Sequence, residues 1–181
     1  MKVTKEQMKV IMPNAGERID IYLPYINDYA DAFNINTPLR MANFLAQVAH
    51  ETAELVHIRE IGNADYCHKY EVGRLAKMLG NTQKGDGYRY KGRGFLHLTG
   101  RANYKAYTNS KYCKGDVVAE PKLLEQPRGA VKSGMWFWLM KGLNALADKN
   151  DILTITKRIN GGTNGLTSRT KYWKRALKAF N

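Results

Sequence analysis

The chain has 181 residues, 44% of them hydrophobic, so it can bury one substantial core and we expect a single domain. Its formal net charge of +13 favours binding to a polyanion, but the charge alone does not distinguish nucleic acid, an anionic membrane and an anionic cell wall. The two cysteines, Cys67 and Cys113, are too few for a disulfide framework or a four-cysteine metal site; we expect free thiols, with one bridge between them left open.

The N-terminal segment MKVTKEQMKVIMPNAGERID carries charges throughout its only apolar stretch, which excludes a signal-peptide core and a transmembrane helix. We therefore expect a protein that is kept in the cytoplasm until something else releases it. Thr4 and Gln7 predict a capping box for a short helix that stops at Pro13. A second helix is predicted over about 17–33, kinked or divided by Pro24.

The clearest helix begins with Thr37 as N-cap and Pro38 as its first residue. An apolar stripe at helical spacing follows, made of Met41, Phe44, Leu45 and Val48. Glu51 comes seven residues after Phe44 and so returns to nearly the same face. Burial there disfavours the charged form, and a carboxyl group that stays protonated near neutral pH can serve as a general acid. The alternative is a glutamate at a helix end that pairs with an arginine.

The pair His50-Glu51 also begins like the zinc-protease motif H-E-x-x-H. Glu54 stands where that motif needs its second histidine, and His57 lies too far along the chain to replace it. We therefore expect no zinc site, and no metal or other cofactor.

A second carboxylate, Glu60, lies nine residues after Glu51. On one continuous helix this step would place the two groups on opposite sides of the axis, so the helix must end between them if they share a site. In an inverting glycosidase the second carboxylate activates a water, with the two carboxyl groups roughly 6.5 to 9.5 Å apart. The alternative is that Glu60 pairs with Arg59 or a nearby lysine.

The composition changes over residues 80–100, where glycines alternate with aromatic and basic residues. This pattern predicts tight turns and a short hairpin. We expect a small irregular lobe at about 55–100 and a helical lobe built from both ends of the chain. Further helices are predicted over 101–107, over 127–141, from Asp151 or Thr154 to Gly161, and from Thr167 or Ser168 to about Phe180. Beyond Asp151 every charged residue is basic, which suits either a solvated helix face or a surface that binds anions.

The run YRYKGRGFLHLTGRANY, residues 88–104, is the most distinctive in the chain. Its glycines allow close backbone approach, and its aromatic faces, amides and hydroxyls suit a sugar. A nucleic-acid-binding protein could use the same alternation of basic and aromatic residues, so the run alone is compatible with binding of a sugar or of a nucleic acid.

Three separated runs together resemble glycoside hydrolase family 19, the chitinase-like enzymes, and in particular its small phage and prophage endolysins. They are TPLRMANFLAQVAHET at 37–52, the segment 90–104, and ITKRINGG at 155–162 followed by GLTSR at 165–169. The resemblance extends from about Val3 to Phe180. It implies a mainly α, lysozyme-like fold with a minimal β-hairpin and a central substrate cleft between two lobes of one domain. It also implies inverting hydrolysis of a β-1,4 bond next to an N-acetylated sugar.

The resemblance assigns roles by motif position. Glu51 matches the general acid, Glu60 the general base, and Thr99 a residue that helps to position the attacking water. The other matches are Asn103 and Asn160 as amides that bind substrate and Arg169 as a support for the carboxylates. His97 stands where relatives often have a glutamine that reaches substrate, and we include Tyr104, at the end of the same segment, among the substrate contacts.

These features predict an endolysin that hydrolyses β-1,4 bonds in peptidoglycan glycan strands as a monomer without a cofactor. We expect it to wait in the host cytoplasm until a separate pore lets it reach the periplasm and cell wall. Its basic C-terminal helix would engage the anionic wall or lipopolysaccharide, and we expect no nucleic-acid partner. A chitinase acting on poly-N-acetylglucosamine stays open as an alternative, with a basic nucleic-acid-binding module as a remote one.

Overall fold

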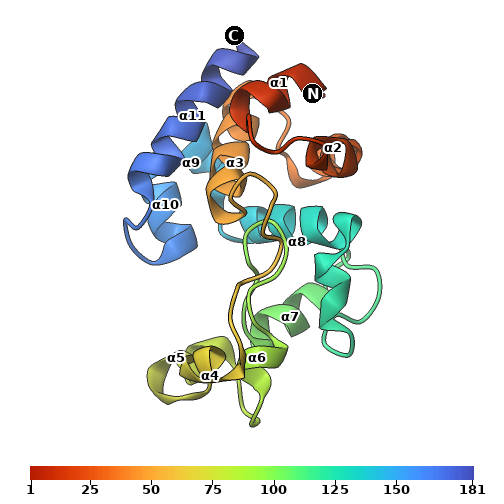
Figure 1. Ribbon diagram of the computed structural model, residues 1–181, viewed down its shortest axis with the longest axis vertical. Coiled ribbons are helices and arrows are strands. Elements are labelled where there is room, and N and C mark those ends of the chain that lie inside the picture. The colour runs from red at the N-terminus through yellow and green to blue at the C-terminus, as the bar shows by residue number, and fades with distance from the viewer. The chain divides into compact units, whose positions relative to one another are not determined.

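The structure is a computed structural model that describes all 181 residues. It is mainly helical (Figure 1), and its β structure consists of two isolated antiparallel bridges, Arg59 with Arg93 and Arg93 with Leu98. The predicted mainly α fold with a minimal hairpin is therefore confirmed. The chain divides into two compact units: unit 1 comprises Met1–Val56 and Met135–Asn181, and unit 2 comprises His57–Gly134. None of the helices combines the length and the apolar character needed to cross a bilayer.

Unit 1 begins with two helices that the sequence predicts. Helix α1, Lys5–Ile11, opens with a capping box in which the Gln7 amide donates to Thr4 Oγ1 (3.2 Å) and the Thr4 amide to Gln7 Oε1 (2.9 Å). Helix α2, Arg18–Tyr29, contains Pro24 and runs directly into a 3-10 turn, η1, at Ala30–Phe33. The predicted helix over 17–33 is thus present as two consecutive elements that meet at Tyr29 and Ala30, and Pro24 lies inside α2 without dividing it.

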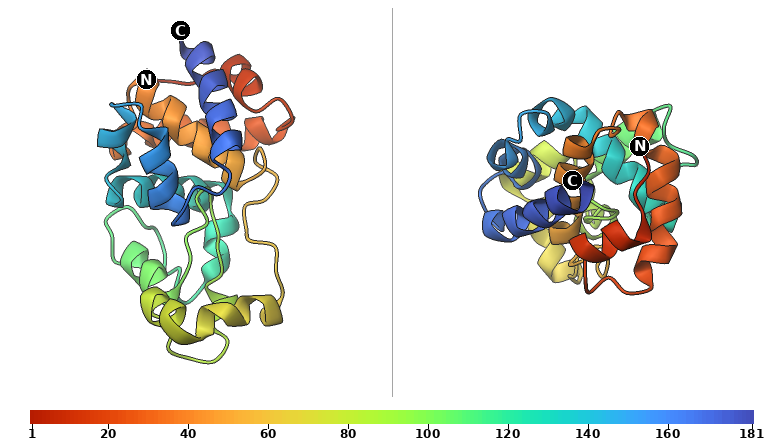
Figure 2. Two further views of the ribbon diagram at one scale, coloured as in Figure 1. Left: turned by 90° about the vertical axis from the view of Figure 1, so that its left-hand side faces the viewer. Right: turned by 90° about the horizontal axis from the view of Figure 1, so that it is seen from above.

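Helix α3, Pro38–Glu51, is the central helix of unit 1. It is capped by Thr37, whose Oγ1 accepts the Arg40 amide at 3.3 Å. Every residue from Met41 to Ala49 is buried, so neighbours cover α3 on all sides. The main neighbour is α11, Leu166–Phe180, which packs along α3 (Figure 2).

Three further elements complete unit 1: the last turns of α8, Pro127–Met140, then α9, Leu143–Ala147, and α10, Ile152–Asn160. Asp151 begins α10 by accepting the Thr154 amide at 3.0 Å, and Gly161 ends it in the left-handed conformation. The start of α10 and its end at Gly161 agree with the prediction.

Unit 2 is built from short helices. They are α4 at Ala64–Cys67, η2 at His68–Glu71, α5 at Gly73–Leu79, α6 at Asp86–Arg89, α7 at Arg101–Thr108, η3 at Pro121–Glu125 and the first part of α8. The unit extends to Gly134, beyond the expected irregular segment, and includes α7. The helices between residues 64 and 79 were not predicted, because one or two turns carry too little periodicity to be recognised.

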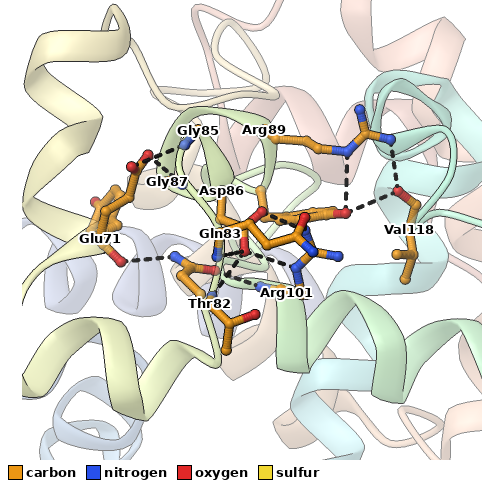
Figure 3. A network of polar contacts seen from close by, with 12 residues as sticks. Glu71, Thr82, Gln83, Gly85, Asp86, Gly87, Arg89, Arg101 and Val118 are labelled. Carbon is orange, nitrogen blue, oxygen red and sulfur yellow. Dashed lines mark hydrogen bonds and ion pairs between the residues drawn. The ribbon is translucent and has the colours of Figure 1, made fainter.

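A buried carboxylate, Asp86, organises the loop that precedes α7 (Figure 3). It is 2% exposed and accepts the amides of Thr82 and Gln83 at 3.0 Å and the guanidinium of Arg101 at 2.5 and 2.8 Å. Burial alone would raise the pKa of Asp86, but Arg101 and the two amides outweigh it and lower that pKa. The Arg101 amide also donates to Asn81 Oδ1 at 2.9 Å, so the first turn of α7 is held by side chains.

Candidate active site

The segment that follows α3 breaks the helix immediately after Glu51. Thr52 is its C-cap, and its Oγ1 accepts the Leu55 amide at 2.8 Å. Residues 53–55 then have positive φ angles of 47°, 58° and 67°, a left-handed turn without a glycine. The helix therefore ends before Glu60, which meets the condition that a shared site for the two carboxylates would set.

Glu51 lies in a buried polar group with Arg169 and Gln47. Arg169 is 2% exposed and donates through Nη2 to Glu51 Oε1 and through Nη1 to Gln47 Oε1, each at 2.5 Å. The Glu51 side chain keeps 18% of its surface exposed. Glu51 therefore pairs with an arginine, as the alternative prediction for a glutamate at a helix end proposed, and it also lies beside the apolar stripe of α3. Gln47 was not singled out from the sequence, although it stands four residues before Glu51 on the same helix face.

His50 lies against Gly165, the residue that precedes α11. A Cβ atom on Gly165 would lie 2.2 Å from His50 Nε2, so only glycine fits before α11, and its φ of 73° also favours glycine. Burial lowers the pKa of His50, the Arg169 charge lowers it further, and Glu51 opposes both. His50 is thus held in its neutral form near neutral pH.

Glu54, the residue in the place of the missing zinc-ligand histidine, belongs to a separate polar cluster. It is 4% exposed and accepts the Asn14 amide (2.5 Å), the Asn14 side chain (3.1 Å) and the Tyr172 hydroxyl (2.9 Å). Burial and the bond to Glu54 raise the pKa of Tyr172 to about 12. The cluster ties the end of α3 to α11 and to the loop after α1.

Glu60, in unit 2, is held by a hydroxyl, an amide and a cation. Tyr70 donates to Oε1 at 2.6 Å, the Gly92 amide donates to Oε2 at 3.2 Å, and Lys69 Nζ lies 3.9 Å from Oε1. The nearby lysine expected as an alternative partner is therefore present, whereas Arg59 pairs with Glu125 at 3.4 Å. Burial and the bond to Glu60 raise the pKa of Tyr70, which keeps its hydroxyl a donor.

Thr99, His97 and Asn103 form one connected group in unit 2. The Thr99 hydroxyl donates to the His97 carbonyl and Asn103 Nδ2 donates to the Thr99 carbonyl, both at 2.7 Å. The His97 ring nitrogen Nε2 lies 3.2 Å from the His57 carbonyl. Since its proton is directed at His97, the Thr99 oxygen presents its lone pairs as an acceptor.

Gly92 lets this group approach Glu60. A Cβ atom on Gly92 would lie 2.9 Å from the His97 Cβ and 3.2 Å from Thr99 Oγ1, while the Gly92 amide binds Glu60. The Glu60 amide also donates to the Gly92 carbonyl at 2.8 Å. The structure thus brings Glu60, Thr99 and His97 together around one glycine.

Tyr104 does not fit the expected substrate contact. It is 0% exposed, its hydroxyl donates to the Lys91 carbonyl at 2.7 Å and accepts from Arg93 at 3.1 Å, and its ring packs edge-on against Tyr90. Burial raises the pKa of Tyr104 to about 12. A fully buried ring with its hydroxyl engaged cannot reach a sugar, so we correct that assignment to a core residue.

The candidate residues therefore fall into two groups. Unit 1 holds Glu51, Arg169 and Asn160, which is exposed at the end of α10. Unit 2 holds Glu60, His97, Thr99 and Asn103. Tyr70 and Lys69, which contact Glu60, were missed in the sequence because a contact across ten residues of irregular chain leaves no periodic signal.

The chain is similar in sequence to known glycoside hydrolases. Residues 27–159 match the sequence model of the glycoside hydrolase 19 family, described as chitinase class I. A Haemophilus influenzae protein described as containing a glycosyl hydrolase family 19 domain is 31% identical over 172 residues, 79% of this chain and 81% of its own length. Chitinase 4 of Oryza sativa is 30% identical over 83% of this chain, which spans 52% of that protein.

Solved structures show the same fold. Chitinase C from Streptomyces griseus aligns with a TM-score of 0.76 over 98% of this chain and 92% of its own, at 23% identity. A class IV chitinase from Zea mays aligns with a TM-score of 0.59 over 99% of this chain and 82% of its own, at 22% identity. At such identities the similarity concerns the fold.

Proposed function

We propose, from the premise that this chain belongs to glycoside hydrolase family 19, that it hydrolyses β-1,4 bonds in the glycan strands of bacterial peptidoglycan. That it is a chitinase-like glycoside hydrolase follows from its family. The choice of peptidoglycan rests on charge. The formal net charge of +13 favours a polymer that carries carboxylates, as peptidoglycan does and chitin does not.

In the proposed mechanism Glu51 gives its proton to the glycosidic oxygen and Glu60 takes a proton from the attacking water, with inversion at the anomeric carbon. Arg169 supports this role because a guanidinium bonded to Glu51 stabilises the carboxylate that remains after proton transfer. Gln47 fixes the direction of that guanidinium.

The proposed base, Glu60, is oriented by hydrogen bonds from the Tyr70 hydroxyl and the Gly92 amide, which leave it able to accept a proton from water. The acceptor oxygen of Thr99 would help to orient the water. His97, Asn103 and Asn160 are the proposed substrate contacts, each half-buried or exposed. No step requires a metal or another cofactor.

We further propose that the protein serves as an endolysin, a monomer that reaches the wall when a separate pore gives it access. Helix α11 carries exposed lysines at positions 171, 174 and 178, which suit an anionic wall or lipopolysaccharide.

A chitinase is the second candidate, because Oryza sativa and Streptomyces griseus relatives bear that name. Its substrate would be neutral poly-N-acetylglucosamine. Both functions use the same two carboxylates, so the choice must come from substrate preference.

The test compares Glu51→Gln and Glu60→Gln with the wild type on purified peptidoglycan and on chitin oligomers. Removal of a general acid or base lowers kcat by about 100-fold or more. Mass spectrometry of the products identifies the reducing-end sugar, and Glu17→Gln, at an exposed residue of unit 1, controls for the loss of one carboxylate. Cleavage of chitin without cleavage of peptidoglycan would overturn the substrate, and full activity of Glu51→Gln would overturn the mechanism.

A further inference from the structure

Unit 2 presents two large aromatic side chains to solvent, and a lysine that contacts one of them also lies beside Glu60. Tyr66 is 49% exposed and Tyr88 is 45% exposed. Each ring has a lysine ammonium over it, Lys69 in one case and Lys91 in the other. We call these four residues the tyrosine–lysine platform.

The platform is a built structure in which the buried lysine joins the two tyrosines. A Cβ atom on Gly62 would lie 2.5 Å from the Tyr66 ring, so this ring packs directly on the Gly62 backbone. The Gly62 carbonyl accepts Lys91 Nζ at 2.9 Å, and the same nitrogen lies 4.4 Å from the Tyr88 ring centroid. Because Lys91 is only 6% exposed, its charge serves this linkage inside the unit.

Lys69 is the platform's outward cation. Its Nζ lies 3.5 Å from the Tyr66 ring centroid, 4.8 Å from that of Tyr70 and 3.9 Å from Glu60 Oε1. Cation–π contacts restrict the position of the ammonium without using its N–H donors in full hydrogen bonds. The side chain is 43% exposed, so a positive charge is held beside Glu60 and faces solvent.

We infer that the platform binds a sugar residue that carries a carboxylate substituent, close to the bond that Glu60 acts on. The part of the Tyr66 and Tyr88 side chains that stays exposed beside their lysines offers an apolar contact to the C–H groups of an N-acetylated sugar. Lys69 binds the carboxylate through a charge-assisted hydrogen bond. The inference rests on the proposed function and deepens it, because it names residues that select an anionic glycan over neutral poly-N-acetylglucosamine.

Lys69 has a competing role, since it also contacts Glu60. A lysine that merely supports Glu60 changes kcat alike on every substrate. A lysine that binds a substrate carboxylate changes KM, and only on the substrate that has one. The two roles therefore separate when one glycan is compared with and without its carboxylates.

The experiment measures kcat/KM on soluble peptidoglycan strands freed of their stem peptides, which leaves the carboxylates of the sugars free, and on the same strands after amidation of these carboxylates. Wild type should prefer the native strands, and Lys69→Gln should reduce that preference about fivefold through KM, the upper range for an exposed ion pair. Lys77→Gln, which removes an exposed lysine of α5 in the same unit, is the matched control and should leave the preference unchanged. Tyr66→Ala should raise KM on both forms, because ring contact does not depend on charge.

Equal losses of kcat/KM on native and amidated strands in Lys69→Gln would overturn the inference. A binding measurement tests the platform without relying on catalysis. The Glu51→Gln protein, with and without Lys69→Gln, is titrated with both forms of the strands. Tighter binding of the native form that depends on Lys69 supports the platform, and equal binding of both forms overturns it. Wild-type cleavage of chitin oligomers alone would instead overturn the proposed function.

Discussion

At the scale of single residues, Arg169 connects most directly to the proposed chemistry. One guanidinium donates to Glu51 and to Gln47 from a position that is 2% exposed. The two donors diverge from one planar group, and a lysine ammonium cannot reproduce that geometry. Glu51 should therefore depend on the shape of the arginine as well as on its charge.

We expect Arg169→Lys to lower kcat about tenfold or more and to lower the free energy of unfolding by about 1–3 kcal/mol, because a buried acceptor loses its donor. Steady-state kinetics and urea unfolding measure the two effects. Arg74→Lys, at an exposed residue of α5, is the control and should change neither. Unchanged kinetics in Arg169→Lys would show that charge alone is enough.

His50 should make stability depend on pH. Its folded-state pKa lies below the ordinary value of 6.5, since burial and Arg169 disfavour the cation. Between that lowered pKa and 6.5 the unfolded chain binds more protons than the folded protein does. The stability contribution is therefore complete above pH 6.5 and declines as the pH falls towards the folded-state pKa.

Urea unfolding at a series of pH values measures this dependence. In His50→Gln the decline below pH 6.5 should become shallower, while His57→Gln, at an exposed residue, should keep the wild-type slope. A slope in His50→Gln equal to that of the wild type would contradict the assignment.

At the scale of elements, the left-handed turn over residues 53–55 determines where α3 ends. The left-handed conformation costs roughly 1–2 kcal/mol for a residue with a side chain. Here the Thr52 cap and the buried contacts of Glu54 offset that cost. The turn thus leaves Glu51 as the last residue of its helix.

Ala53→Gly should relieve part of this strain. Ala53 is exposed and has a φ of 47°, so glycine removes a steric penalty without loss of packing. We expect the free energy of unfolding to rise by about 0.5–1 kcal/mol, after allowance for the entropy that glycine adds to the unfolded chain. Ala106→Gly, at an exposed position inside α7, should instead lower it by about 1 kcal/mol. Destabilisation by Ala53→Gly would show that the turn is not strained.

At the scale of the whole molecule, the net charge of +13 should govern binding to an anionic wall. The Debye length falls from about 10 Å at 0.1 M salt to about 3 Å at 1 M. Attachment of the Glu51→Gln protein to purified cell walls, measured by sedimentation, should therefore weaken about tenfold or more between these concentrations. Binding that does not respond to salt would place recognition in uncharged contacts.

The sequence alone determined the features that depend on near neighbours along the chain. The Thr4 capping box, the Thr37 cap and the start of α10 at Asp151 follow from side chains that bond backbone amides three residues away. The mainly helical fold and the family follow from runs of residues that need no knowledge of distant contacts. For the same reason the sequence by itself indicates Glu51 as a candidate acid.

Tertiary structure decided what surrounds those residues. It brings Arg169 into hydrogen-bond contact with Glu51, 118 positions earlier in the sequence, and Tyr70 into contact with Glu60. It also places Tyr104 in the core instead of on the surface. Burial, ion pairing and the pKa values that follow depend on which distant segments pack together, and a local pattern does not contain that information.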